Sequence, residues 1–183
     1  MDPLLMILKR LLDEHVELVI VGGMAAMFHG STIVTQDIDV CVPFDVPTMT
    51  RVIAALRPIR PTFRMRPDRM PMYDDPERLA KLNLLAIETE WGVIDFLNEV
   101  SGVGRFPDVV AKSESVNVGD GVTAHILSLD ALIDAKRAAN RPKDRLAVTT
   151  LEALRRRFPT RQLNLPFSDP KIPDSSQSPD PPA

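Results

Sequence analysis

The sequence predicts an α/β protein with one compact domain and a small helical appendage. Segments with apolar residues at helical spacing alternate with short segments whose apolar pattern is typical of strands. Of the 183 residues 44% are hydrophobic, enough for one sizeable core, and no internal repeat divides the chain. We therefore expect a core domain over residues 1–127 and a helical extension over 128–160.

The end of the chain has a different composition. Residues 161–183 are rich in Pro, Ser and Asp and contain few apolar side chains. Such a segment cannot bury enough apolar surface to offset the entropy lost on ordering. We expect a disordered tail there.

The first third of the chain predicts short elements around a pair of glycines. Leucines at helical spacing predict a helix over 3–15, and an apolar run predicts a strand over 16–21. Gly22 and Gly23 end this strand at a strand-to-helix turn. Three more elements are expected before Pro58: a helix over 24–28, a strand over 37–42 and a helix over 46–56.

The rest of the domain begins with a proline-rich segment, over 58–76, which we expect to be a long loop. Two strands, over 82–89 and 93–97, are then predicted to form a hairpin. Three elements close the chain: a strand over 122–127, a helix over 129–139 capped by Ser128, and a helix from Pro142 to about 158.

Charge and cysteine content exclude several classes of protein. A net charge of -3 argues against a surface that is basic throughout, as many nucleic-acid-binding domains have. Cys41 is the only cysteine, so no intramolecular disulfide forms, and no Cys/His cluster has the spacing of a zinc site. No segment approaches 18 uninterrupted apolar residues, so we expect a soluble, cytoplasmic protein without a membrane partner.

Carboxylates recur in two of the predicted strands. Asp37 and Asp39 point to the same side of one strand, roughly 7 Å apart, while the residues between and after them face the core. Asp95 repeats the apolar-acid-apolar pattern in a later strand. If the two strands are neighbours, the three acids face one cleft and suit Mg²⁺, which prefers carboxylate and phosphate oxygens. Glu88 or Glu90 is the alternative third acid if the hairpin register differs.

Thirteen residues separate the glycine pair from Asp37. Glycines can bring backbone N–H groups against a phosphate, and the positive end of the following helix favours the same ligand. Each feature alone is common in ordinary turns and strands. Their joint occurrence favours a phosphoryl-transfer site.

The run of Gly22-Gly23, Asp37-Ile38-Asp39-Val40 and Ile94-Asp95-Phe96 resembles the signature of the nucleotidyltransferase fold shared with DNA polymerase beta. The resemblance covers residues 16–97 and, more loosely, 129–154. It is closest to small bacterial members, which include antibiotic nucleotidyltransferases and toxin components of abortive-infection systems. It implies a mixed sheet flanked by helices, two Mg²⁺ ions and transfer of a nucleoside monophosphate from a nucleoside triphosphate to a hydroxyl group.

The resemblance also implies roles for particular residues. Asp37, Asp39 and Asp95 would be the metal-binding and catalytic acids. The nucleotide would be bound with the help of four other residues: Gly22, Gly23, Thr35 and Lys136. Relatives often carry an arginine where this chain has Ile33, which puts one supporting contact in doubt. A module that binds a nucleotide or a partner without catalysis is the alternative function.

Lys136 shares the apolar stripe of its predicted helix with Leu132 and Ile133. A lysine that faces the core requires a partner. The sequence leaves two open: a phosphate or the leaving pyrophosphate, as the resemblance implies, or a structural ion pair with Asp144.

The proline-rich segment and the end of the preceding helix carry several arginines. They could steer RNA or a nucleotide, but a solvated loop is favoured, because few aromatic residues are present to stack bases. The six residues are Arg51, Arg57, Arg60, Arg64, Arg66 and Arg69. The acceptor could be RNA, a protein or a small molecule. We expect His29 to be an ordinary helix-end residue, and Cys41 to have no nucleophilic role.

Overall fold

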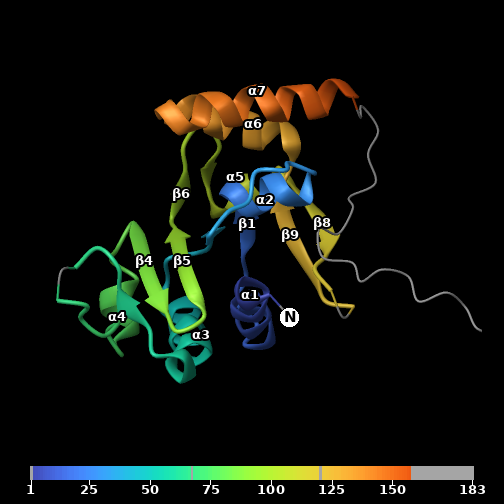
Figure 1. The fold of residues 1–183 in the computed structure, drawn as a ribbon. Coiled ribbons are helices and arrows are strands. Elements are labelled where there is room, and N and C mark those ends of the chain that lie inside the picture. Colours follow the sequence, from blue (N-terminus) through green and yellow to red (C-terminus); the bar gives the residue numbers. More distant parts are fainter. Residues whose placement is uncertain (1, 67, 120, 158–183) are drawn as a thin grey trace, which may run out of the picture.

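The computed structural model describes residues 2–66, 68–119 and 121–157 (Figure 1). The tail expected over 161–183 and the last residues of the expected extension, 158–160, lie outside the described residues. The described part confirms the predicted fold class. It contains a mixed sheet, helices, and a pair of helices at its C-terminal end.

The main sheet has seven strands, two pairs of which are parallel. The strands are β1 (Val19–Val21), β2 (Asp37–Cys41), β3 (Thr62–Phe63), β4 (Leu84–Thr89), β5 (Gly92–Leu97), β8 (Ser113–Asn117) and β9 (Thr123–Leu127). Their order across the sheet is β3-β4-β5-β2-β1-β9-β8. The β2–β5 and β1–β9 pairs are parallel, and the other neighbours are antiparallel. A separate two-stranded sheet pairs β6 (Glu99–Val100) with β7 (Gly104–Arg105).

Helices lie on more than one side of this sheet. The longer ones are α1 (Pro3–Asp13), α3 (Val46–Leu56), α6 (Leu129–Ala139) and α7 (Pro142–Arg157), and the shorter ones are α2 (Gly22–Phe28), the 3-10 helix η1 (Arg57–Ile59), α4 (Pro76–Leu79) and α5 (Phe106–Ala111). In Figure 1, α6 and α7 stack together at the top, and α1 and α3 lie at the bottom. None of the helices described here is long and apolar enough to span a bilayer.

Local sequence explains where the helices begin. The Asp2 Oδ1 atom accepts a hydrogen bond of 2.8 Å from the backbone N–H of Leu4, and Pro3 occupies the first turn of α1. Asp45 caps α3 in the same way through Thr48 N–H, at 2.8 Å. The Ser128 side chain accepts from Ala131 N–H at the start of α6, as the sequence predicts.

The centre of the sheet separates apolar from acidic side chains. In β2 and β5 the apolar residues Ile38, Val40, Ile94 and Phe96 are fully buried. The side chains of the acids that alternate with them project from the opposite face, because successive side chains of a strand point to opposite sides. In β2 and β5 this alternation buries the apolar residues on one face and places the acids on the other, whereas Val19, Val21 and Cys41 are buried on the same face as the acids.

Short elements account for the differences from the sequence analysis. The segment 58–76, expected to be a loop, contains part of η1, the two-residue strand β3 and the start of α4. No element was expected over 98–121, where β6, β7, α5 and β8 lie. These elements are too short, or in β8 too polar, to produce a periodic pattern. The first strand covers only Val19–Val21, where pairing with β2 and β9 begins, and His15, with a φ of 57°, lies in a turn after α1.

Candidate functional site

A row of residues in register crosses the centre of the sheet. Asp39 on β2 lies opposite Asp95 on β5, and Asp95 lies opposite Ala86 on β4. Neighbouring strands are about 4.8 Å apart, so the side chains of Asp39 and Asp95 project from the same face at adjacent positions. Asp37, two residues along β2, lies opposite Val93 on that face. The structure thus brings together the three acids that the sequence predicts; their catalytic role stays a prediction.

Neither alternative acid lies in the row of Asp39 and Asp95, although Glu88 is on the same face of the sheet. Glu88 is on β4, opposite Val93, and its carboxylate pairs with Arg69 at 3.7 Å. Glu90 is in the hairpin turn and pairs with Arg60 at 3.0 Å. The register therefore favours Asp95 as the third acid.

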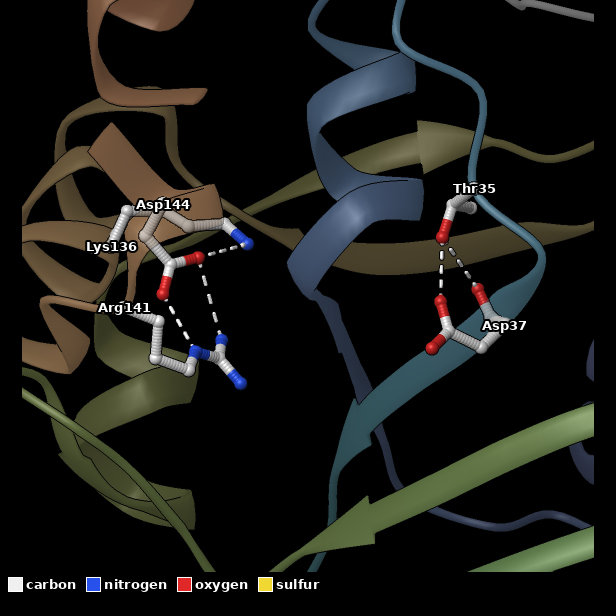
Figure 2. A network of polar contacts seen from close by, with 5 residues as sticks. All are labelled: Thr35, Asp37, Lys136, Arg141 and Asp144. Carbon is white, nitrogen blue, oxygen red and sulfur yellow. Dashed lines mark hydrogen bonds and ion pairs between the residues drawn. The ribbon is translucent and has the colours of Figure 1, made fainter. Parts of the chain in front are cut away.

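Neighbouring side chains contact the carboxylates of Asp37 and Asp95. Thr35 Oγ1 donates a hydrogen bond of 2.6 Å to Asp37 Oδ1 (Figure 2). Arg64 Nη2 forms an ion pair of 2.5 Å with Asp95 Oδ2. Among the described residues, no group of three Asp, Glu, His or Cys side chains lies close enough together to hold a metal ion.

The glycine turn lies directly against this acidic face. Gly22 has a φ of 62°, and a Cβ atom there would overlap the carboxylate of Asp39. A Cβ atom at Gly23 would lie 2.6 Å from Thr35 Oγ1. The sequence suggested that the glycines admit a phosphate to the backbone. The structure shows another requirement: they leave room for the side chains of Asp39 and Thr35.

A second charged cluster joins α6 to α7 around one buried carboxylate. Asp144 is 1% exposed, and its Oδ1 accepts from Lys136 Nζ at 3.2 Å. Arg141 Nε donates to Asp144 Oδ2 at 2.6 Å. The ion pair that the sequence left open for Lys136 is thus present. Figure 2 shows this cluster facing Thr35 and Asp37, with the cationic ends of Lys136 and Arg141 directed toward them.

The two clusters are coupled electrostatically. Burial alone would raise the pKa of Asp144, but the hydrogen bonds from Arg141 and Lys136 outweigh it and lower that pKa below its ordinary value. The hydrogen bond to Asp144 raises the pKa of Arg141, and the negative charges of Asp39 and Asp37 raise it further. Arg141 therefore stays charged while it faces the acids.

Two cavities meet at these residues. One of about 580 Å³ is lined by Asp37, Asp39 and Asp95, by the Lys136–Arg141–Asp144 cluster, and by parts of the 31–35 segment and α7. The other, of about 400 Å³, shares Asp39, Asp95, Lys136 and Arg141 and extends toward Glu99 and Ser101. Asp39 and Asp95 thus line both cavities, whereas Asp37 lines only the larger one.

The remaining candidates have structural surroundings. His29 is 2% exposed, and its Nε2 lies 2.8 Å from the Leu127 carbonyl oxygen, which suits an N–H donor at a helix end. Burial raises the pKa of the Cys41 thiol to about 12, so this thiol does not form a thiolate at neutral pH.

The arginines of the proline-rich segment mostly pair with acids. Arg57 contacts Asp74, Arg60 contacts Glu90 and Arg69 contacts Glu88, all at exposed or half-exposed positions. This agrees with the favoured interpretation of a solvated segment. Arg64 differs, because its partner Asp95 belongs to the acidic row. The sequence analysis missed this contact, since β3 gives no periodic signal that would fix the position of Arg64.

Substitution of Gly22 tests how closely the turn contacts Asp39. We expect Gly22→Ala to lower the free energy of unfolding by about 3 kcal/mol, because a positive φ and steric overlap act together. Gly121→Ala is the matched control: its φ is 76°, with no atom within 4 Å of the added Cβ, so about 1 kcal/mol is expected. Urea unfolding measures both. Equal losses would show that Asp39 does not crowd this turn.

Removal of the buried charge at Asp144 tests the second cluster. We expect Asp144→Asn to lower the free energy of unfolding by about 2–3 kcal/mol at pH 7, because two cations lose their shared partner. Because folding lowers the pKa of Asp144, its stabilisation is present above the ordinary value of 3.8 and is lost as pH falls below it. Urea unfolding from pH 7 to pH 3 should show the two proteins converging. A constant difference would contradict the ion-pair explanation.

Comparisons with known proteins give a likeness of fold. No protein-family model matches the sequence, and no curated protein matches it significantly. A solved candidate nucleotidyltransferase from Thermotoga maritima is similar at 15% identity and a TM-score of 0.46, over 85% of this chain and 89% of that one. The solution structure of the antibiotic-resistance factor ANT(2'')-Ia is similar at 19% identity and a TM-score of 0.47, over 87% of this chain and 93% of that one. These likenesses concern the fold alone and say nothing of activity.

Proposed function

We propose that this protein is a metal-dependent nucleotidyltransferase, which transfers a nucleoside monophosphate from a nucleoside triphosphate to a hydroxyl group and releases pyrophosphate. One observation carries the proposal. Asp39 and Asp95 are paired in register on neighbouring strands, with Asp37 on the same face, and a cationic cluster faces them across a cavity.

The acidic row suits a divalent cation by its chemistry. Two unit charges 4 Å apart repel by about 4 kcal/mol at an effective dielectric constant of 20, so the row favours a bound cation. Asp37, Asp39 and Asp95 would hold Mg²⁺ through hard oxygen ligands after adjustment of their side chains. When bound, the ion would neutralise charge on the phosphate oxygens.

The acids would also act on the acceptor. In this proposal the oxygen of the acceptor hydroxyl forms a bond to the α-phosphorus. Asp95 accepts the proton that this hydroxyl loses. The bond between the α-phosphorus and the bridging oxygen then breaks, and pyrophosphate leaves with the electron pair. Such chemistry depends mainly on positioning and on charge stabilisation.

The helical extension would supply positive charge for the phosphates. Lys136 and Arg141 share one carboxylate, Asp144, so the cluster keeps a net charge of about one positive unit beside the cavity. That charge suits the triphosphate and the leaving pyrophosphate. The core over 1–127 and the extension over 128–160 would thus form one site together. Gly22, Gly23 and Thr35 would shape its wall beside the acids.

A binding module without catalysis is the second candidate. The Arg64–Asp95 ion pair favours it, because a guanidinium holds the proposed third acid. Nucleoside triphosphates should be titrated with and without Mg²⁺, and pyrophosphate release should be measured with labelled nucleotides and a total cell extract. Labelled RNA, protein or small molecules would identify the acceptor class. Nucleotide binding without pyrophosphate release, across a wide panel of acceptors, would favour the module.

Loss of one acid tests the catalytic assignment. We expect Asp39→Asn to lower the transfer rate at least about a hundredfold, because a neutral amide is a poor metal ligand, while the fold stays intact. Glu88→Gln is the matched control, an acid of the same sheet outside the row, and should keep normal turnover. Pyrophosphate release gives the rate and circular dichroism checks the fold. Near-normal turnover of Asp39→Asn would remove this residue from the mechanism.

A further inference from the structure

Arg64 reaches the acidic row from the edge of the sheet. It follows β3 directly, and its backbone N–H donates a hydrogen bond of 3.0 Å to the carbonyl oxygen of Ala86 on β4. Ala86 is the register partner of Asp95, which is the partner of Asp39. These four residues therefore lie in one row that runs from the residue just after β3 across β4 and β5 to β2, with Ala86 between Arg64 and the acids.

The side chains along this row allow the long reach of Arg64. The guanidinium lies 2.5 Å from Asp95 Oδ2 and also lines the larger cavity. Only the methyl group of Ala86 lies between them in register, and Ala86 is 5% exposed. A larger side chain at this position would lie in the path of the arginine.

This ion pair differs from the others of the proline-rich segment. The side chain of Asp95 is 15% exposed, whereas Asp74 and Glu90, the partners of Arg57 and Arg60, are 68% and 50% exposed. Arg64 itself is 36% exposed, so only the carboxylate of this pair is largely removed from water, whereas both partners of the Arg57 and Arg60 pairs are exposed and such pairs contribute little. Arg64 therefore forms the ion pair of this segment that matters most for the charge of the site.

We propose that Arg64 is an exchangeable internal cation: it neutralises Asp95 in the metal-free protein and must leave that carboxylate before a divalent cation binds there. This inference rests on the proposed function, because it takes Asp95 as a metal ligand. The guanidinium contacts Asp95 Oδ2, and the Oδ1 atom is buried, so the guanidinium and the cation compete for Oδ2. Arg64 therefore weakens metal binding, and its release returns a positive charge to the cavity that Lys136 and Arg141 also line.

The test is isothermal titration of the full chain with Mn²⁺, without nucleotide. The variants are Arg64→Gln, Arg64→Met, Asp95→Asn and the double variant Arg64→Gln/Asp95→Asn. We expect both Arg64 variants to bind Mn²⁺ at least about tenfold more tightly than the natural chain, because a hydrogen bond between charged groups opposes binding there. The gain should vanish in the double variant. Arg69→Gln removes an equal charge from the same segment, where its partner is Glu88, and should leave the affinity unchanged.

The outcomes separate this inference from the proposed function. The exchange would be overturned if Arg64→Gln and Arg64→Met bound Mn²⁺ with the same affinity as the natural chain. If Asp39→Asn bound Mn²⁺ more weakly in that case, the proposed metal site would still stand. Absence of Mn²⁺ binding by all of these proteins would overturn both. An equal gain in Arg69→Gln, or a gain that persists without Asp95, would also overturn the exchange, because the effect would then be one of general charge.

Discussion

The site depends on the parallel register between β2 and β5. This pairing places Asp39 beside Asp95, and a shift of one residue would turn every acid of one strand into the core. Ile38 and Ile94, both fully buried, oppose such a shift because they would then face the polar side. The same apolar side chains that form the core therefore also fix the positions of the acids. Stability and the geometry of the site come from one constraint.

Charge balance is the second constraint. An acidic row on one face of a sheet repels itself, and the structure offsets this from two directions. Arg64 reaches one acid from the sheet edge, and Arg141 faces the others from the short connection between α6 and α7. Asp144 in turn holds Arg141 and Lys136 in place, so a buried carboxylate of the extension positions the cations of the site. These cations offset part of the repulsion within the row.

Much of this could be predicted from the sequence, because alternation in a strand is a local property. The apolar-acid-apolar pattern around Asp39 and Asp95 predicted their faces, and the glycine pair predicted a special turn. The contacts made by Arg64 could not be predicted, since β3 exists only through its pairing with β4. The sequence named both possible partners of Lys136, but the choice of Asp144 depends on how α6 and α7 pack. The requirement for Gly22 beside Asp39 likewise appears only when the two strands are placed together.

The most direct measurement is a crystal structure of the protein with Mn²⁺ and a non-hydrolysable nucleoside triphosphate analogue, with anomalous data collected at the manganese edge. We predict an anomalous peak at coordination distance from carboxylate oxygens of Asp39 and Asp95, with the phosphates between the acids and the Lys136–Arg141 pair. Clear density for the nucleotide elsewhere, or no peak beside the acidic row at saturating Mn²⁺, would contradict this account.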